Sequence, residues 1–241
     1  MASFRTLLAW LACASCAWAA DLTPAEVIAK ARAALAQDPA ALAQVRGLRF
    51  ELTSVDADGK PAGYTQLEVN APDQRYQLSL NANRTIEEIL ATNGREGWRK
   101  STQTTQIGVL RSEYVAVLRD MAASDLTFFA APPERAGAVK VAPASEIDGR
   151  KQVSLEYAYK SGFRIIRHFD AETFRLTATD QPMPDGKVQR QRVTATTTVD
   201  GIVFTQKELV LIDGKKVAEV TYEKVVVNPT LAPARFVFPT R

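Results

Sequence analysis

His168 is the residue with the most obvious capacity for chemistry, because it is the only histidine of the chain. It lies in the segment Arg-His-Phe-Asp-Ala-Glu at 167–172, and on a strand His168, Asp170 and Glu172 would point to the same side. An imidazole and two carboxylates on one face are a conceivable metal site. The competing interpretation is that residues 170–173 turn the chain between two strands. We favour the turn and predict no metal site.

Other catalytic signatures are missing from the sequence. It has no Gly-x-Ser-x-Gly elbow, no His-Glu-x-x-His motif and no glycine-rich phosphate loop. Any Ser/His/Asp triad would depend on His168. Glu87 and Glu88 are adjacent, so a strand would place them on opposite faces, and Arg190 with Arg192 is a pattern typical of an exposed sheet face. The sequence therefore gives no basis for an enzyme or for a cofactor.

The N-terminal residues are typical of a secretory signal peptide. Arg5 precedes an apolar run at 6–16, and Ala17-Trp18-Ala19 supplies a small-x-small cleavage pattern. We predict that residues 1–19 are removed and that the mature chain begins at Ala20. A lipoprotein signal would need leucine three residues before the modified cysteine, where Trp10 and Cys13 stand instead.

The composition of the mature chain narrows its class. Both cysteines lie in the signal segment, so no disulfide or thiol chemistry is expected, and the net charge after cleavage is near +2. A net charge this small gives no indication of the clustered cations that a nucleic-acid-binding surface requires. No later apolar run approaches the roughly 20 residues of a membrane span. We expect one domain over residues 20–241, soluble in the periplasm and monomeric.

Two helices are predicted from the sequence. Thr23-Pro24-Ala25-Glu26 is a capping-box start, and apolar residues then recur at helical spacing until near Gln37. A short helical turn follows through Leu42 and Val45. A second helical pattern spans residues 112–124, before Pro132 and Pro133 enforce an extended loop.

Strands are predicted from Gly47 onward. Runs rich in Val, Ile, Thr, Tyr and Phe alternate with turn-forming pairs, which lie at residues 56–59, 93–94, 161–162, 185–186, 200–201 and 213–214. Val153, Leu155, Tyr157 and Tyr159 share one face of such a run, so one face should be buried. We predict a mainly β (α+β) fold with one strongly curved antiparallel sheet, covered by the N-terminal helix and the inserted helix.

An ordered set of segments resembles a known family. The segments are ILATNGREGWRKS at 89–101, EIDGRKQVSLEYAYKSGFRIIRHFDAETFRL at 146–176, VDGIVF at 199–204 and YEKVVVNPTLAPARFVFP at 222–239. In this order they are similar to the LolA-like family of periplasmic outer-membrane lipoprotein-sorting carriers, with its RseB/MucB-type regulatory relatives. The likeness spans residues 48–239. It differs at Ala71, where the carrier has an arginine before the hairpin proline, and at Thr205, where many relatives have proline.

The resemblance implies a fold and a function. The fold is an incomplete β-barrel whose concave apolar interior, covered by helices, holds acyl chains or other lipid groups. The implied function is a non-catalytic periplasmic carrier or binding protein for a lipid, acyl chain or lipoprotein, in lipoprotein sorting or lipid trafficking. The alternative is an envelope sensor or scaffold that binds a partner protein through the same groove. Inner- or outer-membrane proteins are possible partners, and a hydrolase would rest on His168 alone.

Alternation along the strands predicts which side chains line the cavity. Each buried methylene of a ligand would gain about 0.8 kcal/mol there. Trp98, the only tryptophan outside the signal segment, is expected in or near the cavity. The candidate cavity residues are Phe50, Leu52, Leu67, Val69, Leu78, Leu80, Ile89, Trp98, Leu155, Tyr157, Phe163, Ile165 and Phe204.

Overall fold

The computed structural model describes residues 22–102 and 106–239. The predicted signal peptide and the predicted cleavage site before Ala20 lie outside these ranges. The helices are α1 (Pro24–Leu35), the 3₁₀ helix η1 (Pro39–Gln44), α2 (Ser112–Leu126) and the 3₁₀ helix η2 (Pro233–Arg235). The strands are β1 (Gly47–Asp56), β2 (Pro61–Asn70), β3 (Gln74–Asn81), β4 (Ile86–Thr92), β5 (Gly97–Ser101), β6 (Gly108–Val109), β7 (Gly137–Ile147), β8 (Arg150–Tyr159), β9 (Arg164–Asp170), β10 (Leu176–Pro182), β11 (Val188–Val199), β12 (Ile202–Ile212) and β13 (Lys215–Val227).

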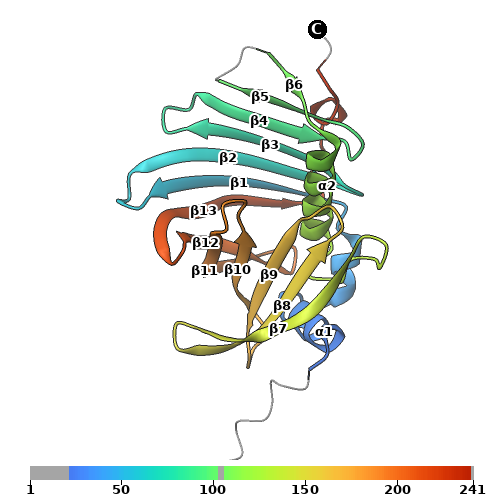
Figure 1. Cartoon of the computed structure of the whole chain (residues 1–241), viewed down its shortest axis with the longest axis vertical. Coiled ribbons are helices and arrows are strands. Elements are labelled where there is room, and N and C mark those ends of the chain that lie inside the picture. Colours follow the sequence, from blue (N-terminus) through green and yellow to red (C-terminus); the bar gives the residue numbers. More distant parts are fainter. Residues whose placement is uncertain (1–21, 103–105, 240–241) are drawn as a thin grey trace, which may run out of the picture.

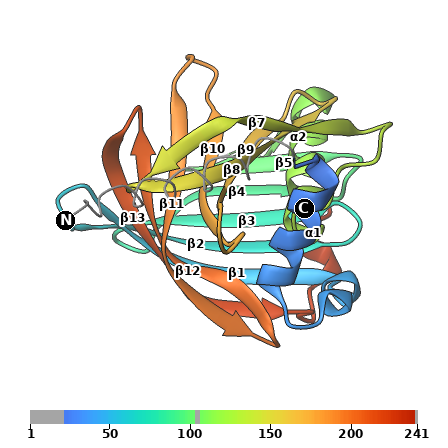
Figure 2. The ribbon, with the colours of Figure 1, turned by 90° about the horizontal axis from the view of Figure 1, so that it is seen from below.

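The strands form one antiparallel sheet. Its order is β6-β5-β4-β3-β2-β1-β13-β12-β11-β10-β9-β8-β7, so β6 and β7 are the two edges and β1 pairs with β13 in the middle. The sheet is strongly curved and does not close (Figures 1 and 2). The predicted architecture, a curved sheet in the form of an incomplete β-barrel, is confirmed.

The tight turns form at the predicted positions. Each of the six turn sites lies between two consecutive strands. In the two-residue loops at Asp200-Gly201 and Asp213-Gly214, both residues have positive φ, between 48° and 78°. Glycine accepts this conformation without strain and aspartate tolerates it better than most residues, which explains why these pairs connect hairpins.

The two long helices begin where capping chemistry and spacing predict. The Thr23 hydroxyl accepts a hydrogen bond from the Glu26 amide, and the Glu26 carboxylate accepts one from the Thr23 amide, as in a capping box. α2 begins at Ser112 as predicted and extends to Leu126, two residues beyond the predicted end. Neither of these helices, nor any other in the described ranges, is long and apolar enough to cross a membrane.

The helices divide the core into two clusters. α1 packs Val27 and Ala31 against the alternating face of β8, where Val153, Leu155 and Tyr157 are buried as predicted. A second cluster joins the end of α2 to β1, β2 and β12. α2 contacts β2, β3 and β4 and lies across these strands in Figure 1. Both helices therefore cover the same face of the sheet, which we call the inner face, while the opposite face is the outer face.

Candidate functional site

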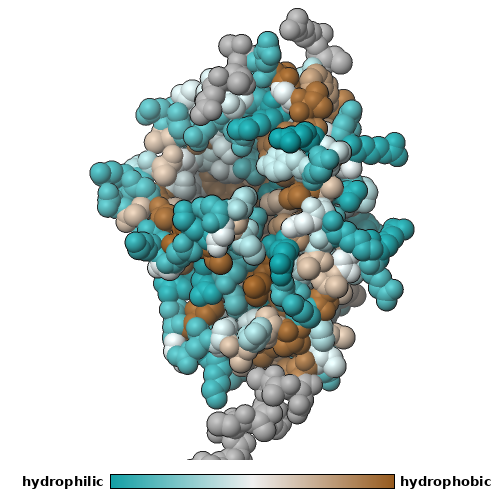
Figure 3. Space-filling view, in the orientation of Figure 1, coloured by the Kyte–Doolittle hydropathy of each residue, from teal (hydrophilic) through white to brown (hydrophobic). Residues whose placement is uncertain are grey.

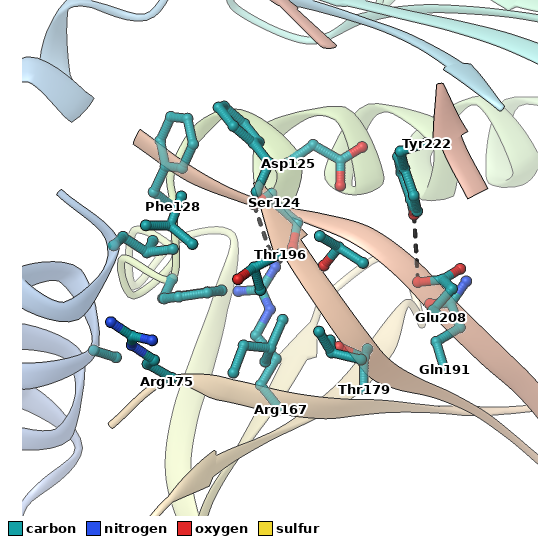
Figure 4. Close-up of a pocket in the computed structure, with 18 of the residues that line it drawn as sticks. Ser124, Asp125, Phe128, Arg167, Arg175, Thr179, Gln191, Thr196, Glu208 and Tyr222 are labelled. Carbon is teal, nitrogen blue, oxygen red and sulfur yellow. Dashed lines mark hydrogen bonds between the residues drawn. The ribbon is translucent and has the colours of Figure 1, made fainter. Parts of the chain in front are cut away.

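A cavity of about 240 Å³ lies on the inner face. Side chains of α1, β1, the C-terminal end of α2 and strands β9 to β13 line it (Figure 4). The face that carries α2 and β9 is mostly hydrophilic, with small apolar areas between charged side chains (Figure 3). The cavity is therefore bounded by both helices and by the central part of the sheet.

One wall of the cavity is apolar and largely aromatic. Leu48 and Phe50 of β1, Phe128 after α2 and Phe204 of β12 line it. The ring centroids of Phe50 and Phe204 lie 6.2 Å apart and those of Phe128 and Phe204 lie 6.3 Å apart, both edge to face. These side chains have no hydrogen-bonding groups, so an apolar ligand can pack against them without breaking a hydrogen bond.

The opposite part of the cavity carries Arg167 of β9. This side chain is 6% exposed, and its Nη2 donates to the Ser124 hydroxyl at 2.8 Å and to the Ser124 carbonyl at 3.3 Å. Its guanidinium also lies over the rings of Tyr157 and Phe129, at 4.8 and 5.0 Å from their centroids. Figure 4 shows Arg167 directed toward Ser124 at the end of α2.

A buried acid lines the same cavity. Glu208 of β12 is 5% exposed, and the Tyr222 hydroxyl donates to its Oε2 at 3.4 Å. Burial raises the pKa of Glu208 to about 7, and the hydrogen bond from Tyr222 opposes this rise only in part. Near neutral pH this carboxyl group is therefore poised between its neutral and charged forms.

Ionic and polar contacts hold the helices over the cavity. Arg75 of β3 pairs with Asp125 of α2 at 2.9 Å. Burial raises the pKa of Asp125, and the guanidinium groups of Arg75 and Arg167 oppose this rise. Arg32 of α1 donates to the carbonyls of Thr127 and Phe128, at 2.6 and 2.9 Å. The end of α2 is thus connected both to the sheet and to α1.

Nine of the thirteen predicted residues are placed on the inner face or in its core clusters. Phe50, Ile165 and Phe204 line the cavity itself. Leu52 pairs with cavity-lining Tyr222, so it shares that face. The five that contribute to the core clusters are Leu67, Val69, Leu155, Tyr157 and Phe163.

Leu78, Leu80, Ile89 and Trp98 lie on the outer face instead. In the register of β2 with β3, Val69 pairs with Arg75 and Leu67 pairs with Gln77, so the inward positions of β3 are polar. The alternation used for β3 to β5 is therefore one residue out of register.

Trp98 is buried at the outer face and not at the cavity. Its exposure is 6%, and its ring lies edge-on to Tyr76 at 6.5 Å. The Arg235 guanidinium of the C-terminal segment lies over the same Tyr76 ring. The tryptophan expected at the cavity therefore packs beside Tyr76, whose ring also contacts Arg235 of the C-terminal segment.

A row of hydrogen-bonded polar side chains crosses the outer face of β8 to β11. The Ser154 hydroxyl lies 2.8 Å from His168 Nδ1, and His168 Nε2 lies 3.1 Å from Asp180, which is held by two 2.7 Å hydrogen bonds from Arg190. Burial alone would raise the pKa of Asp180, but the hydrogen bonds from Arg190 and His168 outweigh it and lower that pKa to about 2. We call these four residues the outer polar row.

The outer polar row has the composition of a Ser/His/Asp triad but not the access of one. Ser154 is 1% exposed and does not line the inner-face cavity, so a substrate carbonyl would not reach it. The row instead connects four neighbouring strands. It supports a structural role rather than the hydrolase hypothesis.

The turn interpretation of residues 170–173 is correct. Asp170 accepts hydrogen bonds from the amides of Glu172 and Thr173, so it caps the connection from β9 to β10. Within the described ranges, no three His, Cys, Asp or Glu side chains lie together in a way that could bind a metal ion.

Arg167, Glu208 and Asp125 are cavity residues that sequence reasoning missed. A signal for Arg167 exists, because Ile165, Arg167 and Phe169 alternate on β9 and share the face buried under α1. A cation between two apolar residues of a buried face is unusual. No comparable signal marks Glu208.

Comparison with known proteins bears on the fold. No family model and no curated protein matches the chain. Among solved structures, a LolA superfamily protein from Nitrosomonas europaea matches with a TM-score of 0.57 and 13% identity, over 90% of this chain and 98% of that one. A domain assigned to outer membrane lipoprotein sorting, from Vibrio parahaemolyticus, matches with a TM-score of 0.55 and 10% identity, over 88% and 94% of the two chains.

A third structure extends this likeness. A DUF1329 family protein from Desulfovibrio piger matches with a TM-score of 0.53 and 12% identity, over 88% of this chain and 95% of that one. The predicted resemblance is thus confirmed at the level of the fold: the chain has a LolA-like fold.

Proposed function

We propose that this protein is a periplasmic carrier or binding protein for a lipid, an acyl chain or a lipoprotein, and that it works by reversible burial without covalent chemistry. The observation that carries the proposal is the inner-face cavity, with its aromatic wall of Phe50, Phe128 and Phe204 beneath two helices. The LolA-like fold supports it, because one solved structure with this fold is assigned to outer membrane lipoprotein sorting.

The energetics favour an apolar ligand. Burying acyl methylenes against the aromatic wall contributes about 0.8 kcal/mol for each group. Entry requires the end of α2 to move, which would break the hydrogen bonds from Arg32 and the ion pair between Arg75 and Asp125. These contacts are few and polar, so they can be exchanged for contacts with water at modest cost.

Organic extraction and mass spectrometry of the exported protein, purified without detergent, test the proposal. We expect a specific lipid or acylated peptide in near-stoichiometric amount. Two adjacent alanines of α1 provide matched variants: Ala34 lines the cavity, whereas Ala33 is exposed. A34W should fill the cavity and lower the extracted amount, while A33W should not. Both variants should retain the wild-type circular dichroism spectrum.

The same experiment addresses the alternative function. An extract no richer than that of an unrelated periplasmic protein, together with a stoichiometric bound protein, would replace the carrier by an envelope sensor or scaffold. N-terminal sequencing of the exported protein tests the localisation, because we expect it to begin at Ala20.

A further inference from the structure

Arg167 differs from the other buried arginine, Arg75, and from the paired carboxylates Glu68 and Asp180. Among the described residues, Arg75 pairs with Asp125, Glu68 with Arg49, and Asp180 with Arg190, each at 2.9 Å or less. Among these described residues, no carboxylate oxygen lies within 4 Å of a guanidinium nitrogen of Arg167. Its Nη1 is also buried without a hydrogen-bond partner.

The surroundings of Arg167 compensate its charge only in part. Taking a guanidinium out of water is costly unless a counter-charge is close. Ser124 supplies neutral acceptors, and the rings of Phe129 and Tyr157 supply cation–π contacts. Negative charge acts on Arg167 only at longer range, from Asp125, which is itself paired with Arg75, so the charge of Arg167 is compensated only in part.

The position of Arg167 connects this partly compensated charge to the cavity. Arg167 lines the cavity together with a second cation, the exposed Arg175. The aromatic wall with Phe50 and Phe204 belongs to the same cavity. An apolar surface and an unpaired guanidinium in one cavity match the two parts of an amphiphile.

We propose that the cavity binds an amphiphile with an anionic oxygen head, a carboxylate or a phosphate, and that Arg167 is the residue that receives this head. The inference rests on the proposed function and specifies its ligand class. The chain of the ligand lies against Phe50 and Phe204, and its head accepts a hydrogen bond from the Arg167 guanidinium. Ser124 and Phe129 both contact this guanidinium, so the head reaches Nη1 when the end of α2 shifts.

Neither of the two acids that line the cavity, Asp125 and Glu208, forms an ion pair with Arg167. Asp125 is held by Arg75 at 2.9 Å. Glu208 hydrogen-bonds to Tyr222 and is mostly protonated below its raised pKa of about 7. A measurement at pH 6 therefore keeps Glu208 largely neutral, while an alkyl carboxylate, with an ordinary pKa near 4 to 5, is ionised.

Calorimetric titration of delipidated protein at pH 6 with sodium decanoate, 1-decanol and decyl phosphate tests the inference. The three probes share a ten-carbon chain and differ in the head. Because hydrogen bonds to charged groups are the strong ones, the wild type should bind decanoate at least about tenfold more tightly than decanol. R167M should lose this preference and keep its affinity for decanol.

Arg164 provides the matched control variant. It lies on the same strand, but it is exposed and pairs with Glu156 on the outer face. R164M should keep the wild-type preference for decanoate. Tighter binding of decyl phosphate than of decanoate would support the inference and assign the head to a phosphate.

The outcomes separate the inference from the proposed function. Equal affinity of the wild type for decanoate and decanol would overturn the role of Arg167 and leave the carrier function standing. An equal loss of all three ligands in R167M would also overturn it, because Arg167 would then only hold α2 in place. No binding of any probe to the wild type would instead count against the carrier function. If R167M does not fold, the affinities of the wild type for decanoate and decanol still test whether the cavity prefers an anionic head.

Discussion

Arg167 and His168 are neighbours on β9, but they lie on opposite faces of the sheet in very different surroundings. His168 belongs to the outer polar row, in which each charged group has a partner within 3.1 Å. Arg167 has no carboxylate within 4 Å among the described residues. A buried charge with a close partner is electrostatically satisfied and is costly only when that partner is removed, whereas a buried charge without one is a candidate position for a charged ligand group.

Removing the central carboxylate of the outer polar row should have the largest effect. D180N leaves the Arg190 guanidinium without its counter-charge and His168 without its carboxylate partner, so the free energy of unfolding should fall by about 3 kcal/mol. Urea unfolding measures this loss. D148N is the matched control, because Asp148 pairs with Arg192 but is 63% exposed, and it should cost less than about 1 kcal/mol. Equal losses in the two variants would remove the proposed distinction between buried and exposed pairs.

The inner face should respond to pH in the opposite sense to the outer face. The pKa of Glu208 is raised from 4.5 to about 7, so its contribution to stability is full below pH 4.5 and is lost as the pH rises through 7. The pKa of Asp180 is lowered from 3.8 to about 2, so its contribution is present above pH 3.8 and is lost as the pH falls through 2. A fall in pH should therefore destabilise the outer face, whereas a rise in pH should destabilise the inner face.

E208Q tests this pH dependence. The amide can keep the hydrogen bond to Tyr222 and cannot ionise, so the variant should gain up to about 3 kcal/mol over the wild type between pH 5 and pH 8. Urea unfolding at both pH values measures the gain, with E223Q at an exposed glutamate as the control. The same difference between E208Q and the wild type at pH 5 and pH 8 would contradict the raised pKa.

A smaller effect is expected where α2 joins the sheet. R75Q breaks the ion pair with Asp125, which is 37% exposed and can regain water, so the loss should be about 1 to 2 kcal/mol. Hydrogen exchange should quicken in α2 and not in β8. R99Q, which breaks the more exposed pair of Arg99 with Glu88, is the control. Unchanged exchange in α2 would show that this pair does not hold the helix down.

The smallest effect is expected at Ser154. S154A removes one hydrogen bond to His168 and should lower stability by about 1 kcal/mol. Its ester hydrolysis should equal that of the wild type, measured with a chromogenic ester. A wild-type hydrolysis rate that S154A abolishes would make the outer polar row a catalytic triad after all.

Local chemistry is why so much of the fold could be predicted from the sequence. The Asp-Gly pairs at 200–201 and 213–214 determine their own backbone conformation, and the Thr23 capping box determines where α1 begins. The alternation of β8 shows which of its residues are buried together. None of these signals depends on a distant part of the chain.

The site was harder to predict because it depends on distant parts of the chain. Alternation gives two faces for a strand but does not say which of them meets the helices. On β3 the helix α2 covers the polar side, where Arg75 meets Asp125, so the apolar Leu78 is directed outward. Trp98 of β5 is directed outward in the same way. Pairing between residues far apart in sequence decides these cases.

The pairing of β1 with β13 has a consequence for the order of folding. Every other strand pair in the described part of the chain joins consecutive strands, whereas here Leu48 pairs with Val227. Two hairpin meanders can form from local contacts, but joining them requires closure of a loop that spans most of the chain. Phe50 of β1 and Tyr222 of β13 line the cavity from the two sides of this seam. We therefore expect the inner-face cavity to be among the last parts of the molecule to form during folding and among the first to be lost when the seam opens.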